Sequence, residues 1–143
     1  MMKTTIIYIS SLLLLFLCSC TDRDVLDRKE GVSLPAVENL TMQQVDEKHV
    51  KITWSIPSAI PAEMELPVKV FIEVKEIVNV TKTLPTFNTT LANAPTEFIY
   101  EIPDGTKTYH LTVKLNGSTK IRDVNYSSNI YSLGQTVVLK GTP

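Results

Sequence analysis

Apolar residues alternate with polar residues in short runs along most of the chain after Leu34. They stand at every second position from Val50 to Ile56 and again from Val68 to Val74, with mostly polar side chains between them. Alternate side chains of an extended strand share one face, so each run predicts a strand with one buried and one hydrated face. Phe71 departs from the second pattern because it adds an aromatic ring to the outer face.

The same alternation predicts further strands, separated by Pro, Gly, Asn and Asp. They are the segments around Leu40 and Met42, a short edge strand at Val78 and Val80, and the segments Phe98–Ile102, Tyr109–Leu115 and Val137–Leu139. The rest of Glu76–Pro95 is interpreted as a connection. No segment after the N-terminal apolar run has helical apolar spacing, and eight prolines oppose long helices. We therefore expect an all-β domain over residues 34–140, a single antiparallel β-sandwich of about seven strands.

The N-terminus has a different pattern, in which Lys3 precedes an apolar run from Ile6 to Leu17 that is interrupted only by the small hydroxyl residues Ser10 and Ser11. This order is typical of a signal peptide, here residues 1–19. The run is shorter than the roughly 20 residues that a membrane-spanning helix needs. It is followed by Leu17-Cys18-Ser19-Cys20, which resembles the lipobox of bacterial lipoproteins. The resemblance implies that acyl chains are attached to Cys20, which then anchors the mature protein in a membrane. An ordinary signal peptide cleaved nearby is the alternative.

Both cysteines of the chain lie at this junction, so a disulfide within the domain is excluded. Residues 20–33 contain the lipidated cysteine and a charged segment with few apolar residues, which predicts a flexible tether. Its first acidic residues, Asp22 and Asp24, resemble the surface-export signal of Bacteroidota lipoproteins. That resemblance implies an outer-membrane protein exposed at the cell surface, with the periplasmic face as the alternative. A solvated linker without any export role is also compatible with these charges.

Two motifs stand in the predicted strands of the domain. Trp54 is followed by Pro57 in a Trp-x-x-Pro spacing, and Tyr109 opens a Tyr-x-Leu-x-Val strand after the turn Ile102–Gly105. Together these motifs resemble the fibronectin type III family. The resemblance implies a sandwich with Trp54 in its core and a tyrosine corner, in which the Tyr109 hydroxyl bonds back to the backbone. With the lipobox and the acidic start, the chain resembles small fibronectin-like lipoproteins of Bacteroidota, many of which accompany glycan-capture systems.

The ionisable residues do not form a catalytic or metal-binding pattern. His49 and His110 are the only histidines, and neither belongs to a zinc-binding spacing. Glu73 and Glu76 stand three apart and are expected to point to opposite faces of a strand. With a formal net charge of −1, the chain also lacks the basic character of nucleic-acid-binding proteins. We expect no enzyme activity, no cofactor and no nucleic-acid partner.

Binding is therefore expected on loops. The segment Asn116–Asn129 combines Arg122, Asn125 and Tyr126 with a hinge at Gly117, which predicts either a binding loop or a loop that is merely packed onto the domain. The expected function is an accessory interaction module that contacts a neighbouring envelope protein of a nutrient-capture system. The alternatives are a structural spacer or assembly subunit of an envelope or fimbrial complex, or direct glycan binding.

Overall fold

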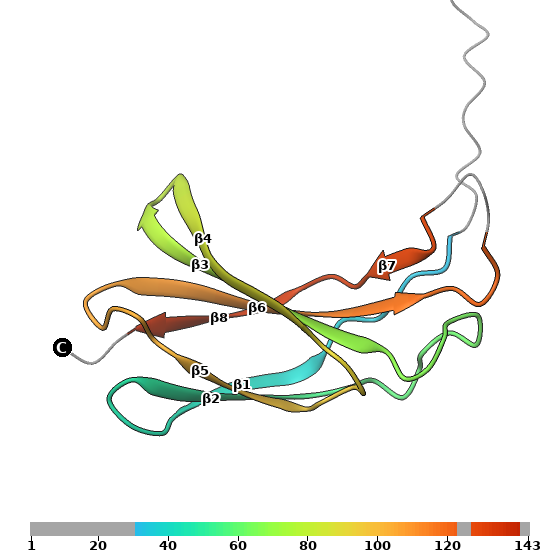
Figure 1. The fold of residues 1–143 in the computed structure, drawn as a ribbon, viewed down its shortest axis with the longest axis horizontal. Helices are drawn as coiled ribbons and strands as arrows, with labels where there is room; N and C mark the ends of the chain where they lie inside the picture. The colour runs from blue at the N-terminus through green and yellow to red at the C-terminus, as the bar shows by residue number, and fades with distance from the viewer. Residues whose placement is uncertain (1–30, 123–126, 141–143) are drawn as a thin grey trace, which may run out of the picture. The chain divides into compact units, whose positions relative to one another are not determined.

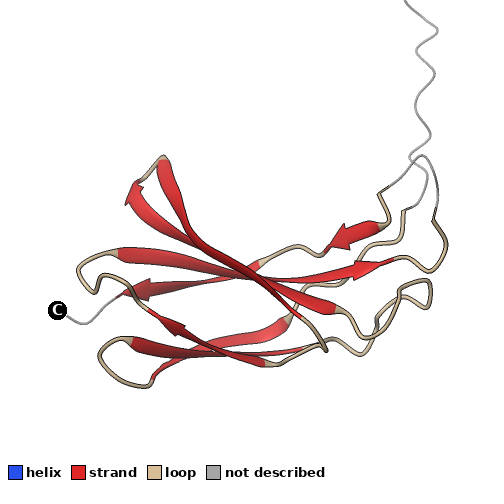
Figure 2. Cartoon of the chain, viewed as in Figure 1, coloured by secondary structure: helices blue, strands red, loops and turns tan. Residues whose placement is uncertain are grey.

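The computed structural model describes residues 31–122 and 127–140, and the compact unit begins at Val32 (Figure 1). All its regular elements are strands (Figure 2). They are β1 (Glu38–Gln44), β2 (His49–Ser55), β3 (Lys69–Asn79), β4 (Lys82–Leu91), β5 (Glu97–Glu101), β6 (Thr108–Ser118), β7 (Asn129–Tyr131) and β8 (Gln135–Lys140). In the described part of the chain, no helix has the length and apolar character to cross a membrane.

The strands form two antiparallel sheets. One has three strands in the order β1-β2-β5, and the other has five, in which β4, β3 and β6 are neighbours and both β7 and β8 pair with β6. Figure 1 shows the two sheets facing each other. The predicted all-β antiparallel sandwich is therefore confirmed, although it has eight strands rather than about seven.

The core lies between the sheets and consists of the alternate positions that the sequence pattern singled out. In β2, in β3 up to Val74 and in β6 up to Leu115, every second side chain is apolar and buried, and the side chains between them are more exposed. Val32 and Leu34, ahead of the first strand, pack against the same core. Burial of apolar side chains is the main favourable term of folding, so this alternation fixes which face of each strand turns inward.

Two of the observed strands, β4 and β7, were not predicted, and the prediction of a short edge strand at Val78 and Val80 is wrong. Val78 belongs to the end of β3 and Val80 lies in the turn that follows, so they do not form a separate edge strand. The supposed connection after them contains β4, an edge strand of mostly exposed Thr and Asn residues that also includes Pro85. An edge strand with one exposed side tolerates proline and needs few apolar residues. The three-residue strand β7 was likewise too short to give a periodic signal.

Tyr109 lies at the start of β6 and is almost fully buried. Its hydroxyl donates a hydrogen bond to the carbonyl oxygen of Asp104, 3.4 Å away, across the turn between β5 and β6. The same turn is held by the Asp104 carboxylate, which accepts bonds from the Thr106 hydroxyl at 2.6 Å and the Thr106 N–H at 2.9 Å. These contacts fix the corner where the chain crosses from the three-stranded sheet to the five-stranded sheet.

Candidate functional site

Two loops at one end of the sandwich are joined to each other by hydrogen bonds. We call the segments 57–66 and 119–122 the loop pole. The Glu65 N–H donates to the Ser118 carbonyl oxygen at 2.8 Å, and the Lys120 N–H donates to the Glu63 carbonyl oxygen at 2.9 Å. The Lys120 ammonium adds a bond to the Ala62 carbonyl oxygen at 2.6 Å. The two loops are side by side in Figure 1 and form one braced unit.

Gly117 lies beneath this pole and was wrongly interpreted as a hinge. It belongs to β6, and a Cβ placed on it would lie 2.6 Å from Met64 Cε and 3.5 Å from Leu34 Cδ1. Met64 is completely buried. The glycine is therefore needed for close packing rather than for motion. Its contact with Leu34 also places the N-terminal entry of the domain at the loop pole.

The predicted binding loop is shorter than expected. Asn116 is buried at the end of β6, where its amide Nδ2 donates to Asn129 Oδ1 at 2.8 Å and to the Ile130 carbonyl oxygen at 3.3 Å. The loop itself begins at Thr119. Of the three residues proposed for binding, Arg122 is exposed, whereas Asn125 and Tyr126 lie outside the described residues.

Exposed apolar side chains accompany Arg122 on the loop pole. Ile121 is 85% exposed and Leu66 is 69% exposed. The centres of protein interfaces are more apolar than the rest of a protein surface and are enriched in arginine, so these three side chains make the loop pole a candidate contact surface. The sequence did not reveal this surface, because leucine and isoleucine are residue types that are usually buried, so Leu66 and Ile121 gave no sign of being exposed.

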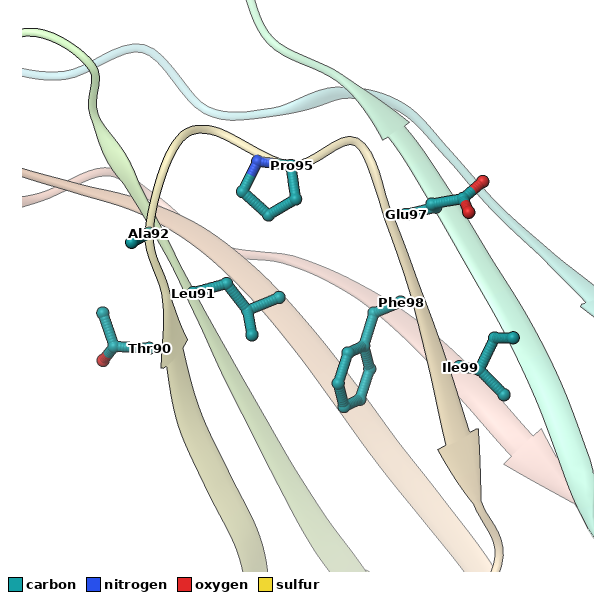
Figure 3. Close-up of a pocket in the computed structure, with 7 residues that line it drawn as sticks. All are labelled: Thr90, Leu91, Ala92, Pro95, Glu97, Phe98 and Ile99. Carbon is teal, nitrogen blue, oxygen red and sulfur yellow. The ribbon is translucent and has the colours of Figure 1, made fainter.

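A second candidate is a shallow hollow of about 610 Å³ at the side of the sandwich, between the edge strands β4 and β5. In Figure 3, Leu91 and Phe98 point into the space between the strands, and the loop with Pro95 passes over it. The Phe98 ring stacks on Phe87 at a centroid distance of 6.0 Å. The remaining lining residues are Thr90, Ala92, Glu97 and Ile99.

This hollow contains one ionisable side chain, Glu97, whose carboxylate forms an ion pair of 2.6 Å with Lys51. The loop above it has left-handed backbone at Asn93 and Ala94, with φ of 64° and 49°. Such geometry is uncommon for alanine and defines the shape of the rim. The lining can bury an apolar group, but its only carboxylate is already paired.

Several other ionisable residues have structural partners. Glu73 pairs with Lys75 and Glu76 pairs with Lys107, each at 3.0 Å. His49 Nδ1 lies 2.9 Å from the Asp46 carboxylate, and hydrogen bonds from the Lys48 N–H, the His49 ring and the His49 N–H lower the pKa of Asp46. Within residues 31–122 and 127–140, no three His, Cys, Asp or Glu side chains are grouped as metal ligands.

Trp54 of β2 lies in the core and is only 4% exposed. Its indole Nε1 is buried and has no hydrogen-bond partner among the described residues. Cys20, the predicted lipid attachment residue, lies outside the described residues.

A family model covers residues 20–139 of the chain, which includes the whole described sandwich up to the last residues of β8. The chain belongs to the family described as Domain of unknown function (DUF4945). No match to the DUF4945 chain was found among curated proteins.

Solved structures show the fold type of this DUF4945 domain. The third fibronectin III domain of human KIAA0343 protein has a TM-score of 0.54 and 14% identity, over 78% of this chain and 86% of that chain. The fibronectin type-III domain of human fibronectin type III domain containing protein 3 has a TM-score of 0.51 and 14% identity, over 80% of this chain and 93% of that chain. A structure described as a myokine has a TM-score of 0.53 and 13% identity, over 78% of this chain and 100% of that chain. The sandwich is therefore fibronectin type III-like, as the Trp54 and Tyr109 motifs predicted.

Proposed function

We propose that this chain is a non-enzymatic lipoprotein of the cell envelope, anchored through acyl chains on Cys20, that contacts a neighbouring envelope protein through the loop pole. The exposed Ile121, Leu66 and Arg122 on the two braced loops are the observation that carries this proposal. The hydrogen bonds that join the loops reduce the conformational entropy lost on binding, which favours recognition by a preformed surface.

The anchor is supported by the apolar run, the Leu17-Cys18-Ser19-Cys20 sequence and the start of the family match at Cys20. A single acyl chain gives only marginal membrane binding, so stable retention requires the two or three chains of a lipoprotein. The acidic residues Asp22 and Asp24 favour the outer face of the outer membrane. A partner there would belong to a surface nutrient-capture system.

A non-enzymatic role is supported by the state of the ionisable groups. The carboxylates of Glu73, Glu76 and Glu97 are each paired with a lysine. General acid–base chemistry needs a free, positioned group with a suitable pKa in a cleft. The exposed loops are the better candidate for function.

Cross-linking in intact cells tests the proposal, with the double variant Leu66→Ser and Ile121→Ser in the full chain. Removal of two apolar contact residues is expected to reduce the yield of a discrete cross-linked protein species by about tenfold or more. Val80→Ser is the matched control, because Val80 is a fully exposed aliphatic residue in the turn between β3 and β4. An unchanged melting temperature shows that the double variant is folded. A cross-linked species of unchanged yield, or the lack of any such species in the wild type, would overturn the proposal.

A further inference from the structure

The outer face of the five-stranded sheet has an aromatic pair near its β7 edge. Phe71 of β3 and Tyr131 of β7 meet edge to face, with ring centroids 5.6 Å apart and an interplanar angle of 79°. Tyr131 is 49% exposed and Phe71 is half-buried. In the strand register, Phe71 is next to Lys114, and Tyr131 is next to Asn116. The pair therefore offers aromatic surface to solvent on a sheet face that also carries the exposed side chain of Val138.

An irregularity between β7 and β8 positions Tyr131. The Leu115 N–H donates to Ser132 Oγ at 2.8 Å, and the Ser132 N–H donates to the Leu115 carbonyl oxygen at 2.9 Å. The serine hydroxyl thus replaces a backbone acceptor of the ladder. Gly134 follows so close to β6 that an added Cβ would lie 2.5 Å from Thr112 Cγ2. Breaks of this kind redirect side chains on sheets and occur frequently beside binding sites.

The same outer face is basic, although the chain as a whole has a formal net charge of −1. Both β3 and β8, which pair with β6, contribute lysines to this positive charge. The register of β3, β6 and β8 places four lysines and one glutamate on this face, namely Lys69, Lys75, Lys114, Lys140 and Glu73. Glu73 is paired with Lys75 at 3.0 Å. Within the described residues, the other three lysines have no carboxylate at salt-bridge distance.

Polar groups complete the surface. Thr112 and Thr136 are neighbours across β6 and β8, with their hydroxyl oxygens 2.8 Å apart. Along β3, the distance from Lys69 to Lys75 is about 20 Å at roughly 3.4 Å per residue. The four lysines therefore lie on three strands, β3, β6 and β8, and are spread over this face rather than gathered at one point.

We propose that this face binds an acidic polysaccharide, a chain of uronic-acid sugars. The open ring surface of Tyr131 and Phe71 suits the C–H face of a sugar ring, because aromatic faces are apolar and carry partial negative charge. The three lysines without a carboxylate partner among the described residues suit regularly spaced carboxylates, and the threonine hydroxyls suit sugar hydroxyls. None of the residues named for this site belongs to the loop pole, so each proposal can fail without the other.

Titration calorimetry of the soluble, unlipidated domain with polygalacturonate tests the proposal, provided that circular dichroism shows the domain folded. Methyl-esterified polygalacturonate is the matched probe without charge, and poly-glutamate is the matched polyanion without sugar rings. We expect polygalacturonate to bind, with an affinity that decreases as ionic strength rises. The esterified polymer and poly-glutamate are expected to bind about tenfold more weakly or not at all.

Variants separate the two contributions. Tyr131→Ala is expected to weaken polygalacturonate binding by about tenfold, the scale of one lost stacking ring. Tyr131→Phe should retain most of the affinity, and Lys114→Gln should reduce both the affinity and its salt dependence. Lys48→Gln, in the turn of the other sheet, is the control and should bind as wild type. Equal binding of poly-glutamate, an unchanged affinity of Tyr131→Ala, or no binding of polygalacturonate would each overturn the proposal.

Discussion

Replacement of Trp54 offers a sharp test of the core, because its indole N–H is buried without a partner among the described residues. Trp54→Ala removes a large side chain that is only 4% exposed and is expected to cost about 3–5 kcal/mol of unfolding free energy. For a domain of ordinary stability, about 5–15 kcal/mol, this is a large fraction of the total.

Trp54→Phe has a different balance. The smaller ring loses burial and leaves some space, at a cost of about 1–2 kcal/mol. It also removes a buried N–H that has no partner among the described residues, and leaving such a group unsatisfied costs about 1–3 kcal/mol. The two effects oppose each other, so Trp54→Phe is expected to lie within about 1 kcal/mol of the wild type.

Equilibrium unfolding in urea, followed by circular dichroism, measures both variants. Circular dichroism is required because Trp54 is the only tryptophan and both variants lose its fluorescence. The denaturant slope should stay constant, so that shifts of the midpoint report stability. A Trp54→Phe variant as unstable as Trp54→Ala would refute the reasoning about the unpaired N–H. A Trp54→Ala variant that unfolds with the wild type would refute the burial of Trp54.

Two further variants test the loop pole's base and the turn before Tyr109. Gly117→Val should lower the free energy of unfolding by about 1–3 kcal/mol, because the Cβ of the new side chain would meet Met64 Cε at 2.6 Å. Urea titrations of Gly117→Val, Met64→Ala and the double variant test this clash, and additive effects of the two substitutions would contradict it. Hydrogen bonds from the Thr106 hydroxyl and N–H lower the pKa of Asp104 from its ordinary value of 3.8, so the stabilisation is present above pH 3.8 and is lost as pH falls through the lower folded-state pKa. Melting temperatures in acid should therefore fall more steeply for the wild type than for Asp104→Asn, and parallel pH profiles would argue against this role.

The sequence predicted the parts of the fold that depend on periodic burial. Alternating apolar residues in β2, β3 and β6 identified the central strands, and the Trp54 and Tyr109 motifs indicated the fibronectin type III-like sandwich. β4 was missed because an edge strand with exposed Thr and Asn residues lacks that alternation. β7 was missed because three residues are too few to show a period.

The candidate sites were harder to predict because they depend on contacts between distant segments. The loop pole depends on hydrogen bonds such as Glu65 to Ser118, which no local pattern encodes. Phe71 was recognised as an outward-facing ring, but its partner Tyr131 is placed by the irregularity at Ser132. Gly117 was misinterpreted because its neighbour Met64 is far away in the sequence.

The lipid anchor is the claim on which the rest of the functional account depends, because it brings the loop pole to an envelope partner. Mass spectrometry of the protein extracted from its native membrane tests it directly. The account predicts a mature polypeptide that begins at Cys20 and carries diacylglycerol on the cysteine sulfur. The Cys20→Ala variant is expected to accumulate as the uncleaved precursor. An unmodified N-terminus downstream of Cys20 in the native protein would contradict the account.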